Sequence, residues 1–135
     1  MKMVALLKRD ERGVAATEMA LALPILITMI YGIFQVGLLY QANAGMQHAL
    51  GEGARLATIC IPSGNTCNPP SDAAIKTRMT SKLFGKSDGT FTVNNPGVGV
   101  GYRDLSISYT RSMNFIFFRG PTITLNRSKR AYTVS

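Results

Sequence analysis

Glu18 is the residue whose chemistry is least expected from its surroundings. It lies directly before a run of 22 residues, Met19 to Tyr40, without a charged side chain. An unpaired carboxylate would cost several kcal/mol at the centre of a bilayer, but near the interface it stays close to water. Glu18 therefore either lies at headgroup level, only ~7 Å beyond Gly13 along a helix, or pairs with a positive charge. A cut after Gly13 would create such a charge, because Val14 would then carry a free α-amine.

Cys60 and Cys67 are the only two cysteines, and both follow the apolar run. Two thiols supply only half of a tetrahedral structural metal site, so a disulfide is the favoured interpretation. Closing a loop of ~8 residues would stabilise the fold by roughly 2–3 kcal/mol on the chain-entropy estimate. The sequence thus predicts a Cys60–Cys67 disulfide, formed under oxidising conditions.

No other set of residues indicates catalysis or a bound cofactor. His48 is the single histidine, so a nucleophilic triad would lack its usual base, and a solvated surface position is expected. Gly97, Gly99 and Gly101 are not followed by the Gly-Lys-Ser/Thr of a phosphate-binding loop, and a flexible turn is expected there. The carboxylates after the apolar run are scattered: Glu52, Asp72, Asp88 and Asp104. The sequence predicts no enzyme, no metal and no cofactor.

Positive charge dominates the chain from residue 14 onward, with 11 Lys and Arg against five Asp and Glu. Three basic residues gather near the end: Arg127, Lys129 and Arg130. Such a surface could contact DNA phosphates, lipid headgroups or acidic partner proteins, and composition does not choose among them. The apolar stretch Phe115–Phe118 beside Arg119 is interpreted as core or head–helix packing, with a membrane-surface contact as the alternative.

The uncharged run Met19–Tyr40 predicts a transmembrane helix. At ~1.5 Å per residue it extends roughly 33 Å, enough to cross a ~30 Å hydrocarbon layer. A removable secretory signal usually has an apolar region of only ~7–15 residues. The charges before the run are mostly positive: Lys2, Lys8, Arg9 and Arg12 against Asp10 and Glu11. This bias predicts a cytoplasmic N-terminus and an exported remainder, and Pro24 predicts a kink in the helix.

Beyond the span, apolar residues recur at helical spacing from Ala42 to Ala57, so an amphipathic extension to about Ile59 is expected. Ile75, Met79 and Leu83 predict a second short helix over about residues 71–84. "TFTV", "DLSISYT" and residues 122–134 have the pattern of strands, and "NNPGVGVG" that of a loop between the first two.

These elements predict an α+β fold. A long N-terminal helix should carry a small head with a short helix and a three- to four-stranded antiparallel sheet. The expected divisions are a basic leader over residues 1–13, the transmembrane helix over 14–40, the amphipathic extension over 41–59 and the exported head over 60–135.

Two stretches carry a resemblance to a known family. "RDERGVAATEMALALPILI" resembles the prepilin-type leader of type IV filament subunits. "RGVAATEMALALP", followed some 30 residues later by "GEGARLA", is similar to the TadE-like minor pilins (pseudopilins) of tight-adherence (Tad) pilus systems. The resemblance covers roughly residues 8–58. Met19 departs from the tyrosine or phenylalanine usual at that position, and the long head fits a minor subunit better than the very short major ones.

The resemblance implies cleavage after Gly13 by a membrane prepilin peptidase, with Val14 as the new N-terminus. Glu18 would then pair with the Val14 α-amine of a neighbouring subunit. It also implies a bacterial inner-membrane protein that enters or initiates a Tad-type pilus for surface attachment. Its partners would be other pilin subunits and the Tad inner-membrane assembly proteins.

A second function class stays open on the sequence. The chain could be a stand-alone single-pass membrane protein whose basic exported head binds DNA or an anionic surface. Processing separates the two classes, because only the pilin requires the loss of residues 1–13.

Overall fold

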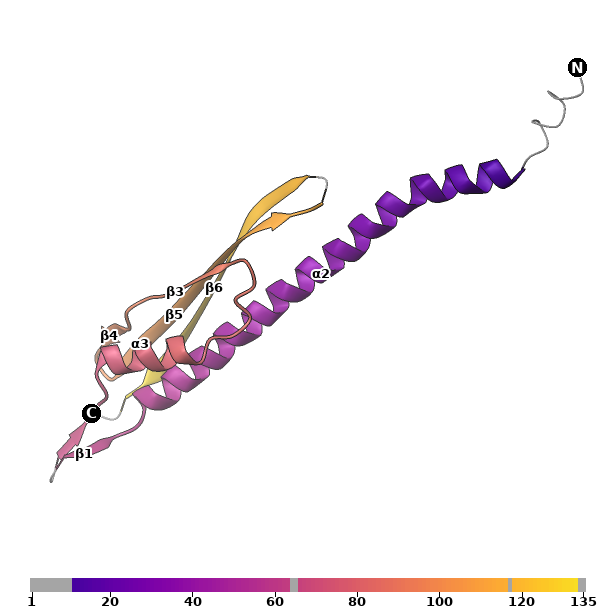
Figure 1. Ribbon diagram of the computed structural model, residues 1–135. Helices are drawn as coiled ribbons and strands as arrows, with labels where there is room; N and C mark the ends of the chain where they lie inside the picture. Colours follow the sequence, from indigo (N-terminus) through magenta and orange to yellow (C-terminus); the bar gives the residue numbers. More distant parts are fainter. Residues whose placement is uncertain (1–10, 64–65, 117, 134–135) are drawn as a thin grey trace, which may run out of the picture.

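The computed structural model describes residues 11–63, 66–116 and 118–133. The expected leader charges Lys2, Lys8, Arg9 and Asp10 lie outside the described residues, so the leader stays a prediction. The described chain is one long helix that carries a small α+β head along its second half (Figure 1). This arrangement confirms the expected fold class.

Helix α2, Glu11–Ala57, is continuous over 47 residues. It includes both the apolar run and its amphipathic extension, and it ends two residues before the expected Ile59. Pro24 lies within the helix and cannot donate a backbone hydrogen bond. Four residues later the Thr28 hydroxyl donates to the Pro24 carbonyl oxygen at 2.7 Å, a side-chain bond that often bends helices. A kink at Pro24 stays a prediction.

Helix α3, Asp72–Ser81, begins at an N-cap serine, because the Ser71 hydroxyl accepts a hydrogen bond from the Ala74 amide at 3.3 Å. Its buried side chains Ile75 and Met79 pack against α2. The helix ends three residues before the predicted Phe84. The chain straightens there to cross α2 in close contact with Gly45, and Gly85 adopts a positive φ of 79° as it leaves.

The segment between the two cysteines forms a small antiparallel hairpin at the end of α2. Its strands are β1, Ile61–Ser63, and β2, Thr66–Asn68, and they pair Pro62 with Cys67. The hairpin places the backbone around Cys60 beside that around Cys67. This register agrees with the proposed disulfide, which stays a prediction.

Alkylation of the membrane-extracted protein is expected to label neither cysteine unless the protein is reduced first. A reduced and denatured sample is the matched control, and both thiols should react in it. Loss of the bond should cost roughly 2–3 kcal/mol, which loosens the end of the head without unfolding it. Labelling of both thiols without reduction would remove the disulfide from the account.

The sheet is built around one long central strand. Its strands are β3, Thr90–Val93; β4, Gly97–Gly99; β5, Tyr102–Asn114; and β6, Arg119–Tyr132. Strands β3 and β4 pair with successive parts of one edge of β5, and β6 pairs with the other edge, all antiparallel. The β5–β6 hairpin runs beside α2 and ends near its middle (Figure 1).

Two expectations for the sheet were wrong. The predicted loop "NNPGVGVG" contains strand β4, because β5 supplies pairing partners for Gly97, Val98 and Gly99. Strand β5 is also longer at both ends than the predicted "DLSISYT", and β6 begins three residues earlier than predicted, so the hairpin extends to Asn114 and Arg119. Hydrogen bonds between neighbouring strands stabilise β4 although glycine has a low strand propensity, and they also stabilise the extended ends of the hairpin.

The hydrophobic core lies between the second half of α2, helix α3 and one face of the sheet. From α2 it receives Ala42, Met46, Ala49, Leu50, Ala54 and Ala57, and from β5 it receives Leu105, Ile107 and Tyr109. Tyr109 is fully buried, and its hydroxyl donates to the Ser87 carbonyl at 2.9 Å. The predicted amphipathic extension is therefore the face of α2 on which the head packs.

Candidate functional site

The first half of α2 is a helix surface that the head does not cover. Leu21 is 74% exposed and Ile25 is 72% exposed, and the neighbouring apolar side chains are similar. Burial of one such side chain away from water would stabilise the protein by about 1.5–3 kcal/mol. The helix is long and apolar enough to cross a bilayer, so this half indicates a single-pass membrane anchor.

Gly13, Val14 and Glu18 all lie on this uncovered half. Val14 and Glu18 are four residues apart and therefore occupy the same face of the helix, and the Thr17 hydroxyl between them donates to the Val14 carbonyl at 2.8 Å. Glu18 is exposed, and it makes no hydrogen bond or ion pair with the described residues. The structure thus brings Val14 and Glu18 together and leaves Glu18 available to a second molecule.

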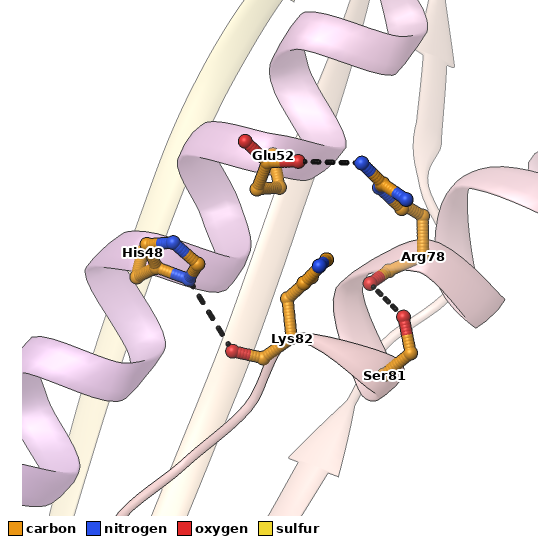
Figure 2. A network of polar contacts seen from close by, with 5 residues as sticks. All are labelled: His48, Glu52, Arg78, Ser81 and Lys82. Carbon is orange, nitrogen blue, oxygen red and sulfur yellow. Dashed lines mark hydrogen bonds and ion pairs between the residues drawn. The ribbon is translucent and has the colours of Figure 1, made fainter.

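The "GEGAR" segment, Gly51–Arg55, is the part of α2 on which α3 docks. Glu52 accepts a hydrogen bond from Arg78 at 2.9 Å (Figure 2). This bond lowers the pKa of the Glu52 carboxyl against a smaller opposing effect of burial, and the positive charges of Arg78, Arg55 and Lys82 add to the lowering. Glu52 therefore stays ionised and binds α3 to α2.

One turn earlier, His48 contacts the end of α3. Its Nδ1 lies 3.4 Å from the Lys82 carbonyl oxygen (Figure 2). Its ring lies 5.8 Å from the Phe84 ring. The side chain remains exposed, as expected from the sequence. These contacts assign His48 to the α2–α3 interface.

Two glycines of α2 allow this interface to be close. A Cβ at Gly45 would overlap the backbone carbonyl of Phe84, and a Cβ at Gly53 would overlap the side chain of Met79. Glycine in a helix interior costs about 1 kcal/mol relative to alanine. The close contact explains why glycine stands at positions 45 and 53 in spite of this cost. The "GEGAR" segment therefore has a structural role, because it lets α3 pack closely on α2.

The basic residues near the end of the chain do not form one patch. Side chains alternate between the two faces of a strand, so Arg127 and Lys129 lie on one face of β6 and Arg130 on the other. Arg130 forms two hydrogen bonds with Asp104, at 2.7 and 2.9 Å, and its guanidinium lies 4.1 Å from the Tyr102 ring centroid. The three basic residues therefore do not form a single patch on β6, and the binding of DNA or an anionic surface by the head stays a prediction.

Arg127 lies at the interface between the head and α2. Its Nε donates to the Asn43 side-chain oxygen of α2 at 2.7 Å. A shallow groove lies beside this contact, between α2 and β6, and it is lined by Val36, Leu39, Tyr40 and Leu125. Arg127 therefore helps to hold β6 against the helix just beyond the uncovered half.

Sequence reasoning missed two polar side chains that the fold buries. Gln35 lies inside the predicted span at 3% exposure, and its Nε2 donates to the Asn114 carbonyl at 3.2 Å. Arg111 on β5 is also 3% exposed, and its Nη2 lies 3.8 Å from the Asp88 carboxylate. A lone amide in an apolar helix was a signal for the first. The signal for Arg111 was its position in the alternation of Leu105, Ile107 and Tyr109, which places it on the inward face of β5.

Among the described residues, no three His, Cys, Asp or Glu side chains gather as a group that could hold a metal ion. In the comparison with known families, the model of the TadE-like protein family matches residues 13–55. The matched range begins at Gly13 and ends with the "GEGAR" segment. No curated protein and no solved structure matches the chain.

Proposed function

We propose that this chain, whose residues 13–55 match the TadE-like family model, is a Tad pilus-associated protein and a minor pilin of that pilus. In this role, prepilin peptidase cuts after Gly13 on the cytoplasmic side of the inner membrane. The shortened chain is then extracted from the membrane and enters or initiates the filament, which serves in surface attachment. The head is exported and faces away from the filament axis.

The single observation that carries the proposal is the position of Glu18. It lies on the uncovered half of α2, on the same face as Val14 and without a partner among the described residues. A carboxylate in an apolar helix surface is costly unless a positive charge compensates it. A Val14 α-amine from a neighbouring subunit would supply that charge within a bundle of helices.

The shape of the subunit also supports assembly. The core of the head packs along the second half of α2, and Phe115 of the β5–β6 hairpin reaches back to Tyr31. The helix before Tyr31 can therefore leave lipid and pack against other helices without rearrangement of the core. Apolar side chains that are exposed to lipid tails can be exposed to neighbouring apolar helices at little cost. The same apolar surface of α2 can therefore face lipid in the membrane and neighbouring helices in the filament.

Replacement of Gly13 by Val is expected to block processing, because the added side chain places bulk at the scissile bond. The measurement is the mass of the chain from cells with an active prepilin peptidase. Gly37→Val is the matched control, since a Cβ at Gly37 also meets no neighbouring atom within 4 Å, and this variant should be cut normally. If both variants lose residues 1–13 equally, Gly13 is not the processing position.

A further inference from the structure

The β5–β6 hairpin ends in a tip, described over residues 114–116 and 118–119, that touches the apolar part of α2. The Phe115 amide donates to the Phe118 carbonyl at 2.9 Å and closes the turn. Phe115 meets Tyr31 edge to face, with ring centroids 6.5 Å apart. The hydrogen bond from Gln35 to the Asn114 carbonyl fixes the base of the tip. The tip is thus held beside residues 31–35 of the helix.

This level of the helix coincides with the expected membrane boundary. A helix that enters the hydrocarbon layer at Val14 leaves it near Phe34, because 21 residues at ~1.5 Å each extend roughly 31 Å. If the span instead covers Met19–Tyr40, the tip lies deeper. In both registers the tip is at the edge of the bilayer or within it.

The tip has the composition of a segment that lies at this boundary. Ile116 is 58% exposed and Phe118 is 54% exposed, so the head does not bury them. Phe118 stacks on Phe115 at 4.6 Å, and exposed Arg119 follows directly. Aromatic side chains favour the membrane interface, and an arginine there can bury its stem while its charge reaches lipid phosphates.

We propose that the hairpin tip is a second membrane contact, which inserts Ile116 and Phe118 into the interface of the leaflet on the head's side. Arg119 then faces the phosphate groups. The contact fixes the rotation of the whole subunit about the axis of α2 relative to the bilayer, because the subunit then contacts the membrane through both α2 and the tip. The proposal rests on membrane insertion of α2 and is independent of the pilus role.

The chain contains no tryptophan, so a single introduced tryptophan is an unambiguous reporter. Ile116→Trp is compared with Val100→Trp in the full chain, reconstituted into vesicles that contain phospholipids brominated at defined depths. Val100 is 101% exposed and lies at the other end of β5, roughly 40 Å from the tip at ~3.3 Å per residue. Leu26→Trp, at an exposed position within the span, reports insertion of α2.

The tryptophan at position 116 should be quenched several-fold more than that at position 100, and most strongly by bromines near the headgroups. The tryptophan at position 26 should respond most to deep bromines. Equal, weak quenching at 116 and 100 would overturn the proposal. A blue-shifted tryptophan at 116 that bromines do not quench would also overturn it, because protein would then cover the tip.

The two proposals fail in different ways. A chain that keeps residues 1–13 but shows quenching at position 116 would lose the pilin role and keep the membrane contact. Absence of quenching at position 26 would remove both the anchor and the tip contact.

Discussion

Glu18→Gln is expected to leave the protein in the membrane but to exclude it from filaments. The substitution removes a negative charge from the start of the span, so membrane insertion should be unchanged or improved. Cleavage after Gly13 should continue. In the filament, however, the Val14 α-amine of a neighbouring subunit would be buried without its partner. Removal of one member of a well-buried ion pair costs about 3–5 kcal/mol, which is enough to prevent stable incorporation.

The measurement is the amount of this chain in filaments and its crosslinking to other pilin subunits. Glu18→Asp is the graded control, because it keeps the charge and shortens its reach, and it should give intermediate incorporation. The total membrane level of each variant distinguishes failed assembly from failed expression. Wild-type incorporation and crosslinking of the Gln variant would show that Glu18 is only an interfacial charge.

Gly45→Ala is expected to destabilise the head, whereas Gly51→Ala should stabilise it. Both glycines lie in the interior of α2, so both substitutions gain about 1 kcal/mol from helix propensity. At Gly45 the new methyl group would overlap the Phe84 carbonyl, and backbone must move to accommodate it. Overpacking of this kind costs typically about 1–3 kcal/mol and sometimes more. At Gly51 no atom lies within 4 Å of the added Cβ.

The pair can be compared by thermal unfolding of the detergent-solubilised chain, monitored through the tertiary signal of the head. Opposite shifts of the midpoint, downward for Gly45→Ala and upward for Gly51→Ala, are the expected result. Two shifts in the same direction would mean that the crossing of residues 82–85 over Gly45 is not as close as described.

The long helix and its docking face could be predicted from sequence because their signals are local. The uncharged run indicated the span, and the spacing of Ala42, Met46 and Ala49 indicated the buried face. The start of α3 after its N-cap Ser71 was likewise predictable, since the cap and the stripe of Ile75 and Met79 are close in sequence.

The rest depends on contacts between distant residues. Strand β4 forms only because β5 offers a paired edge to Gly97–Gly99, and the glycines themselves favour a turn. The position of the hairpin tip depends on how far β5 extends along α2, which local patterns do not fix. The same holds for Glu52, whose role became visible only when α3 placed Arg78 beside it.

For the candidate site, the sequence supplied Gly13, Val14 and Glu18 through spacing and resemblance. The structure adds that Val14 and Glu18 share a face on the uncovered half of α2, and that the matched "GEGAR" segment holds the head in place. It also changes the interpretation of the basic end of the chain, because strand alternation separates Arg130 from Arg127 and Lys129.

The intact mass of this chain in the filament fraction sheared from cells tests the central claim most directly. The account predicts that the chain is present in that fraction and that its mass corresponds to a protein beginning at Val14. A chain that stays in the membrane fraction with residues 1–13 intact, in cells whose other pilins are processed, would contradict it.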